Sequence, residues 1–198
     1  MTAPLARLGA ASLLIALAGC VGVPRAPVPP DVLAAATVTV STAQDGRFIS
    51  LVGPRRLHAE PFLGVGDTNF DLLRSWIDTR SHETTHQLYV EDSYLGAERN
   101  WESARIQGGP TLRFIPISKH EITCDYGCSY AEEFAAALPE ALLRASPRGL
   151  AVSFTARSGA EQTILVPGEL IARQLAAVDA TRASLPKAAA AAPSNPVR

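Results

Sequence analysis

The chain has 198 residues, of which 47% are hydrophobic, 6% aromatic and 19% charged. These proportions fit one globular domain with additional segments, and they exclude both a wholly disordered chain and a multidomain machine. Lys and Arg total 18 and Asp and Glu total 19, which gives a formal net charge of -1. Because no global positive charge is available to neutralise phosphates, we expect no nucleic-acid partner.

Residues 1–19 have the three-part layout of a secretory signal peptide. A positive charge at Arg7 precedes an apolar run from Leu8 to Ala18, and small residues follow it. The run is about half as long as the ~20 apolar residues that a transmembrane helix needs. The layout therefore predicts a signal peptide rather than a retained membrane helix.

The segment Leu17–Cys20 resembles the lipobox of bacterial lipoproteins. This resemblance implies that Cys20 is acylated on its sulfur, that cleavage makes it the first residue, and that its new amino group is acylated. Two or three acyl chains anchor a protein stably, whereas one chain binds only marginally. In Gram-negative lipoproteins an Asp after the cysteine favours the inner membrane, and Val21 stands there. The resemblance thus implies the outer membrane, facing the periplasm; the alternative is an ordinary signal peptide that leaves Cys20 free.

Two proline-containing segments flank the predicted domain. Residues 20–36 carry Pro24, Pro27, Pro29 and Pro30, which predicts an extended tether after the lipidated cysteine. Residues 182–198 place an alanine run between prolines, which predicts a flexible tail. The packed periplasmic domain is therefore expected at residues 37–181.

Period-2 hydrophobic patterns dominate that span and predict antiparallel strands. The expected strands are residues 37–40 paired with 47–52, 72–78 paired with 84–90, 111–117, and 150–157 paired with 162–166. Because proline cannot donate to a ladder, Pro116 predicts an edge strand or a bulge.

Fewer segments favour helix. Ile171, Leu175 and Val178 share one face of a helix that begins at Pro167 and extends to about Ala180. Residues 139–145 predict a second, short helix that stops before a proline. Residues 130–138 fit either helix or strand, and we assign them to a strand. The fold class is then α+β, with a β-rich antiparallel sheet or decorated sandwich and one or two helices.

The segment His82–His86 matches the H-E-x-x-H pattern of zinc hydrolases. That chemistry needs a helix, because only helical spacing directs His82 and His86 at one metal while Glu83 activates the water. The β-branched residues and the strand-like sequence around this segment predict a turn and a strand instead. We therefore expect no zinc here and no other cofactor, and the zinc-hydrolase interpretation remains the alternative.

Cys124 and Cys128 are separated by a short loop that contains Gly127. In an oxidising periplasm such a pair normally forms a disulfide. A thiol redox pair, or a metal site that adds His120, is the alternative.

The region between Glu91 and Gly109 is expected to be rich in loops and to carry a binding surface. Its candidate residues are Tyr94, Arg99, Trp101 and Arg105, because aromatic and Arg side chains are enriched at binding hot spots. Trp101 can alternatively fill the core. The pairs Glu91-Asp92 and Glu132-Glu133 are expected to lie on solvated faces.

The segment Thr85–Val90, with Trp101, the two cysteines and the last predicted helix, resembles uncharacterised lipoproteins of proteobacteria. This resemblance implies location and a shared fold, and it implies no activity. Taken together, the sequence predicts a lipid-anchored periplasmic domain with a binding or envelope-structural role and an envelope protein as its partner.

Overall fold

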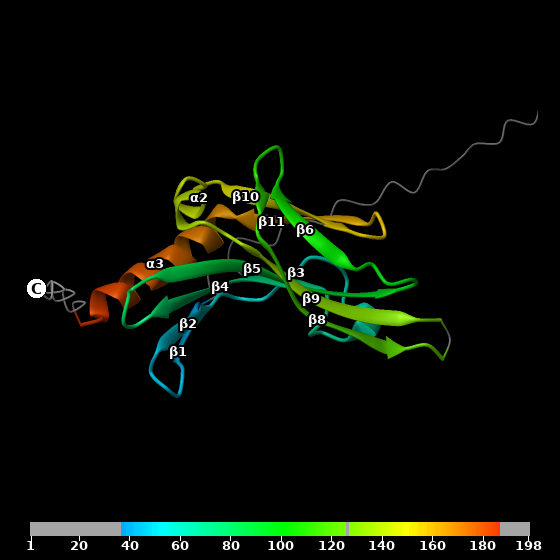
Figure 1. Ribbon diagram of the computed structural model, residues 1–198, viewed down its shortest axis with the longest axis horizontal. Helices are drawn as coiled ribbons and strands as arrows, with labels where there is room; N and C mark the ends of the chain where they lie inside the picture. Colours follow the sequence, from blue (N-terminus) through cyan, green and yellow to red (C-terminus); the bar gives the residue numbers. More distant parts are fainter. Residues whose placement is uncertain (1–36, 126, 187–198) are drawn as a thin grey trace, which may run out of the picture.

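The computed structural model describes residues 37–125 and 127–186, which form two antiparallel sheets and two helices. The seven-stranded large sheet contains β1 (Thr39–Thr42), β2 (Phe48–Val52), β3 (Arg56–Leu57), β4 (Phe70–Asp78), β5 (Thr84–Leu95), β8 (Phe114–Thr123) and β9 (Ser129–Ala137). The four-stranded small sheet contains β6 (Trp101–Ile106), β7 (Thr111–Leu112), β10 (Gly149–Ala156) and β11 (Glu161–Pro167). The helical elements are η1 (Phe62–Gly64), α2 (Glu140–Arg144) and α3 (Gly168–Ser184). The predicted α+β class is thus confirmed (Figure 1).

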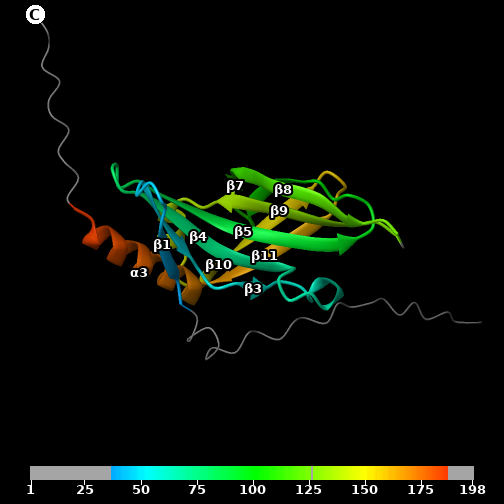
Figure 2. The ribbon, with the colours of Figure 1, turned by 90° about the horizontal axis from the view of Figure 1, so that it is seen from below.

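The strand order is β1-β2-β4-β5-β9-β8 in the large sheet, where β3 also pairs with β4, and β11-β10-β6-β7 in the small sheet. The inner face of the large sheet is covered by the small sheet at one end and by α3 at the other (Figures 1 and 2). Every second side chain of a strand points to the inner face, and these inward side chains form the hydrophobic core.

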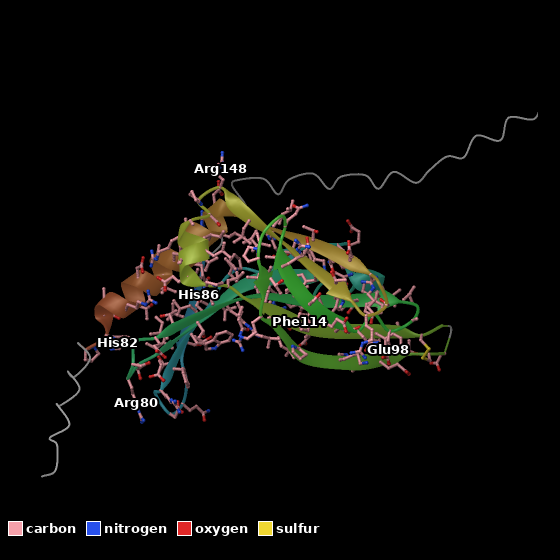
Figure 3. All side chains as sticks on the ribbon, turned by 45° about the horizontal axis from the view of Figure 1, so that its top comes forward. Arg80, His82, His86, Glu98, Phe114 and Arg148 are labelled. Atoms are coloured by element: carbon pink, nitrogen blue, oxygen red, sulfur yellow. A yellow bond between two sulfur atoms is a disulfide. The ribbon has the colours of Figure 1, made fainter. Side chains whose placement is uncertain are left out.

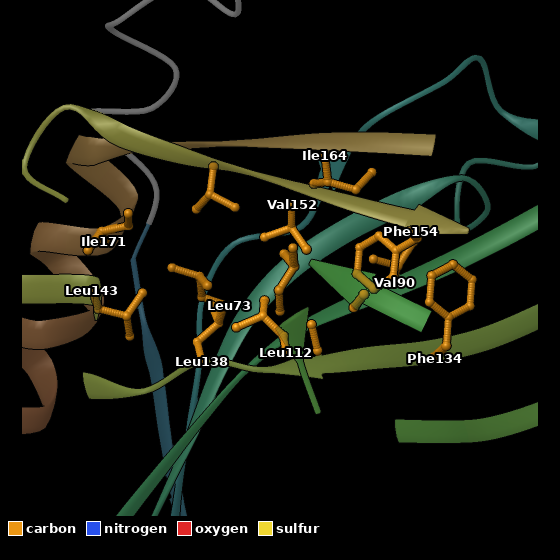
Figure 4. Close-up of a cluster of buried hydrophobic side chains, with 14 of the residues drawn as sticks. Leu73, Val90, Leu112, Phe134, Leu138, Leu143, Val152, Phe154, Ile164 and Ile171 are labelled. Carbon is orange, nitrogen blue, oxygen red and sulfur yellow. The ribbon is translucent and has the colours of Figure 1, made fainter. Parts of the chain in front are cut away.

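Phe134 and Val90 of the large sheet face Val152, Phe154 and Ile164 of the small sheet (Figure 4). All five side chains are buried, so this layer between the sheets is the main hydrophobic core. A second cluster forms where Val178 of α3 packs on Leu51 and Ile77.

Most of the predicted elements occur where the sequence places them. The four strands of the predicted hairpins at residues 37–52 and 72–90, the β10–β11 pair, the strand at residues 130–138 and both helices are confirmed. Pro116 lies on β8, an edge strand that also has a register shift at this proline, as expected.

Three expectations are corrected by the structure. The region from Glu91 to Gly109 is not mainly loop, because β5 continues to Leu95 and β6 occupies Trp101–Ile106. The strand predicted at residues 111–117 divides at Arg113, so that β7 pairs with β6 in one sheet and β8 pairs with β9 in the other. Helix α3 extends to Ser184, because Arg182 of its last turn binds Glu140 of α2; the flexible tail predicted from residue 182 therefore begins too early.

The predicted signal peptide, Cys20 and the tether lie outside the described residues. Within the described part of the chain, neither helix has the length and apolar character required to span a bilayer.

Candidate functional site

A cleft of about 410 Å³ opens where β6, β8 and β9 meet at the open side of the two sheets. We call it the inter-sheet cleft. It is lined by Asn100, Trp101, Glu102, Phe114, Pro116, Ile117, Ser118, Lys119, Glu132, Glu133, Phe134 and Arg157. A concave site with an apolar lining and a few polar groups is the usual form of a binding pocket.

Aromatic rings form the wall of the cleft. The ring centroid of Phe134 lies 5.2 Å from that of Trp101 and 5.8 Å from that of Phe114. Phe154 supports them from the core, with its centroid 5.0 Å from that of Phe134. Phe114, whose position is labelled in Figure 3, stays partly exposed and lines the cleft, so one ring of a packed cluster is presented to it.

Two buried carboxylates fix Trp101 in this wall. Its indole Nε1–H donates to Asp92 Oδ2 (2.9 Å), and its backbone N–H donates to Glu132 Oε2 (3.1 Å). Asp92 also accepts two bonds from Arg99 Nη1 (2.9 and 2.7 Å), and Glu132 accepts bonds from the Tyr94 hydroxyl and the Asn100 backbone N–H. Burial raises the pKa of Asp92, and the Arg99 charge opposes that rise. The wall is therefore pre-organised by hydrogen bonds behind it.

Charged side chains frame the opening. Lys119 Nζ of β8 donates to Glu98 Oε2 (2.6 Å) and to Asn100 Oδ1 (2.8 Å), which ties the edge strand to the β5–β6 loop. Arg157 Nε donates to Glu102 Oε2 (3.1 Å) at the small sheet. These pairs are solvent-exposed and contribute little stability, so they can rearrange when a ligand enters.

The structure separates the four residues that the sequence predicts for binding. Tyr94 and Trp101 are only 4% and 6% exposed, so the prediction that they present a surface is wrong, and Trp101 fills the core-side wall of the cleft. Arg99 is committed to Asp92, while Arg105 is exposed on β6. Sequence reasoning missed Phe114 and Lys119, which lie on a mostly exposed strand with no clear alternation.

The acidic pairs also differ from expectation. Glu91, Asp92 and Glu132 are buried, and only Glu133 remains partly exposed. Glu91 accepts bonds from the Asn69 backbone N–H and the Ser93 hydroxyl, while burial raises its pKa. The prediction of solvated faces failed because hydrogen-bond donors next to β5 compensate the buried carboxylates.

The H-E-x-x-H segment forms a hairpin turn and the start of β5, as predicted. His82 has a φ of 61°, which lies in the left-handed region and is incompatible with a continuous helix through both histidines. His86 Nδ1 lies 2.8 Å from the Ser75 hydroxyl oxygen in a hydrogen bond, and that oxygen also accepts from Gln174 Nε2 (2.9 Å). His86 Nε2–H then donates to Glu140 Oε2 (3.4 Å).

This Ser75–His86–Glu140 chain is a structural link rather than a nucleophile system. Ser75 is 0% exposed, so no substrate reaches its hydroxyl. The chain joins β4 and β5 to α2 and, through Gln174, to α3. Burial lowers the pKa of His86, and hydrogen bonds from Arg182 lower the pKa of Glu140, so neutral His86 lies against an ionised carboxylate.

Cys124 and Cys128 form a disulfide with a sulfur–sulfur distance of 2.10 Å at the tip of the β8–β9 hairpin, as predicted. Among the described residues, no group of three or more His, Cys, Asp or Glu side chains has the arrangement needed to hold a metal ion.

Comparisons of this chain with protein-family models, curated proteins and solved structures gave no match.

Proposed function

We propose that this protein is a lipid-anchored envelope protein that binds an extended, apolar segment of a partner protein in the inter-sheet cleft. The observation that carries the proposal is the partly exposed Phe114 ring at the cleft, which is backed by the buried Trp101 that Asp92 and Glu132 hold in place. A rigid aromatic surface beside an open cleft contributes to affinity, because little conformational freedom is lost on binding.

The position of the cleft supports an extended peptide as its occupant. β8 forms one edge of the large sheet and pairs on one side with β9. Its other edge offers backbone groups to which a peptide strand can add, and alternate side chains of that peptide then enter neighbouring pockets. Phe114, Pro116 and Ile117 lie on this strand and also line the cleft.

Anchoring through Cys20, which the lipobox resemblance implies, makes a modest interface sufficient. A tethered domain is confined near the membrane, which raises its effective concentration toward an envelope partner. The anchor and the binding site are separate parts of the proposal, and each has its own test.

The binding proposal is tested by filling the cleft without removing any core side chain. Ser118 lines the cleft and is exposed, so Ser118→Trp places an indole in the opening. Ser103→Trp is the matched control, since Ser103 is exposed on β6 outside the cleft. After gentle solubilisation from the native envelope, we expect a stoichiometric partner to accompany wild type and Ser103→Trp and to be lost from Ser118→Trp. Equal recovery of the same partner with all three proteins would contradict the proposal.

A further inference from the structure

The outer face of the large sheet, which points away from the small sheet and α3, carries a separate arrangement of polar and aromatic groups. Leu73, Ser75 and Ile77 of β4 point inward, so Arg74 and Trp76 point outward. The register places Arg74 opposite Gln87 on β5, and Tyr89 lies two residues further along that strand. Arg74, Trp76, Gln87 and Tyr89 therefore adjoin one another on this face.

The Arg74 guanidinium is held in a fixed position by these neighbours. Its carbon lies 4.9 Å from the ring centroid of Trp76 and 4.5 Å from that of Tyr89. Its Nε and Nη2 both donate to Gln87 Oε1, at 3.1 and 3.0 Å. Tyr89 lies beside Glu133, and burial together with that carboxylate raises the pKa of its hydroxyl. A guanidinium carries five N–H donors, so among the described residues this arrangement leaves Nη1 and one hydrogen of Nη2 without an acceptor.

In the described part of the chain, no carboxylate directly contacts the charge of Arg74. Within the described residues, no Asp or Glu oxygen lies within 4.0 Å of its guanidinium, although it is only partly exposed. By contrast, Arg56 and Arg99, which are also partly buried, pair with Asp71 and Asp92. Burial accordingly lowers the pKa of Arg74, and the neighbouring Tyr89 and Glu133 side chains oppose that decrease. A partly desolvated cation whose hydrogen-bond acceptor is a neutral amide is suited to a bound anion.

We propose that Arg74 is an anion-binding residue and that its site takes the carboxylate or phosphate group of a small organic ligand. The free guanidinium N–H groups donate to the oxyanion. The partly exposed Trp76 and Tyr89 rings contact an apolar or aromatic body attached to it. This site uses none of the residues that line the inter-sheet cleft, apart from the indirect contribution of Glu133.

The test is a titration of the full-length protein with benzoate, phenyl phosphate and inorganic phosphate. It is followed by the tryptophan fluorescence, to which Trp76 and Trp101 both contribute, and by the NMR signals of the Arg74 Nε–H and the Trp76 indole N–H. We expect saturable shifts with one or both organic anions, and their relative affinities identify carboxylate or phosphate as the preferred group. Inorganic phosphate is expected to bind about tenfold more weakly than phenyl phosphate because it lacks the apolar body.

Gln87→Glu is the sharpest variant, because it keeps the shape of the side chain and supplies an internal carboxylate opposite Arg74. We expect it to fold like wild type and to lose affinity at least about tenfold. Arg74→Gln is expected to abolish the shifts, and Arg148→Gln, at an exposed position between α2 and β10, serves as the control that retains them. Unchanged affinity in Gln87→Glu would overturn the proposal. Equal binding of inorganic phosphate and phenyl phosphate, or no saturable shift with any of the three anions at millimolar concentration, would also overturn it.

Discussion

Trp101 and Asp92 show how single residues of this domain combine packing with hydrogen bonding. The indole lies in the wall of the inter-sheet cleft and donates 2.9 Å to a carboxylate that is only 4% exposed. Leaving a buried acceptor without its donor costs more free energy than the hydrogen bond contributes, because the acceptor stays desolvated. The polar residues behind the cleft are thus part of the fold, and substitutions there test it.

Trp101→Phe is expected to lower the free energy of unfolding by about 1–3 kcal/mol, because Asp92 loses the indole donor. Trp76→Phe is the matched control, since Trp76 lies on the outer face with no hydrogen-bond partner among the described residues. Trp76→Phe should lower the free energy of unfolding by less than about 1 kcal/mol. Urea unfolding of both variants measures the difference, and equal losses would contradict the role assigned to the Trp101–Asp92 bond.

Asp71 predicts a pH dependence of stability. Its carboxylate is almost fully buried and accepts bonds from Arg56 Nη2 (2.7 Å) and Nε (3.2 Å). Burial raises its pKa from 3.8 to about 6, and Arg56 opposes the rise. Because the folded protein binds this proton more tightly than the unfolded chain, stability falls as pH rises between these two values.

Asp71→Asn removes this titration. We expect the free energy of unfolding of wild type to fall relative to the variant by about 2 kcal/mol between pH 4 and pH 6, since one pKa unit corresponds to about 1.4 kcal/mol and the titration is incomplete at both ends of this interval. Glu91 and Asp92 are present in both proteins, so the difference between the two pH curves isolates Asp71. Parallel curves across this interval would show that Asp71 titrates normally.

At the scale of elements, the sequence predicts strands best where one face of the strand is buried. The alternation in β10 leads directly to the observed strand. The strand at β1 was predicted from its β-branched residues alone, since all four of its residues are exposed. β6 was not predicted because its residues do not alternate between buried and exposed. A register shift in its pairing with β10, between Thr155 and Ala156, leaves two consecutive residues, Glu102 and Ser103, exposed.

The candidate cleft was predictable only in part, because it depends on which strands pair with one another. Trp101 stands out by residue type, whereas Phe114 joins it only because the chain changes sheets at Arg113. A local pattern does not specify such a change, since the partners that separate β7 from β8 lie far away in the sequence, on β6 and β9. The Arg74 site escaped prediction for the same reason, as it depends on the β4–β5 register.

The start of α3 provides a test at this scale. A Cβ added to Gly168 would lie 2.0 Å from the backbone oxygen of Pro147, so only glycine allows α3 to approach the α2–β10 loop. Gly168→Ala is expected to destabilise the protein by about 3 kcal/mol or more, because backbone must move. Gly66→Ala, where a Cβ meets open space, is the control and should change stability by less than about 0.5 kcal/mol. Similar melting temperatures for the two variants would contradict this packing.

At the scale of the whole molecule, the proposal combines an anchor with a binding domain. The described domain presents the inter-sheet cleft along one free strand edge and the Arg74 site on the outer face of the large sheet. A domain held near a membrane can use both surfaces at moderate affinity.

The anchor itself is tested at Cys20. Mass spectrometry of the protein extracted from cells with detergent is expected to find Cys20 as the first residue, with acyl chains attached. Cys20→Ser should remain unacylated and leave the membrane fraction, because a thioether-linked lipid cannot form. A Cys20→Ser protein that is cleaved, acylated and membrane-bound like wild type would refute the lipoprotein assignment.

Site-specific photo-crosslinking in intact cells tests the central claim, that the inter-sheet cleft binds a partner. A photoreactive residue at Ile117, which is 40% exposed and lines the cleft, is compared with one at Leu165, which is 64% exposed on the outer side of β11. The account predicts one discrete crosslinked partner from position 117 that disappears when Ser118→Trp is added, and no such product from position 165. The same products from both positions, or no product from position 117, would contradict it.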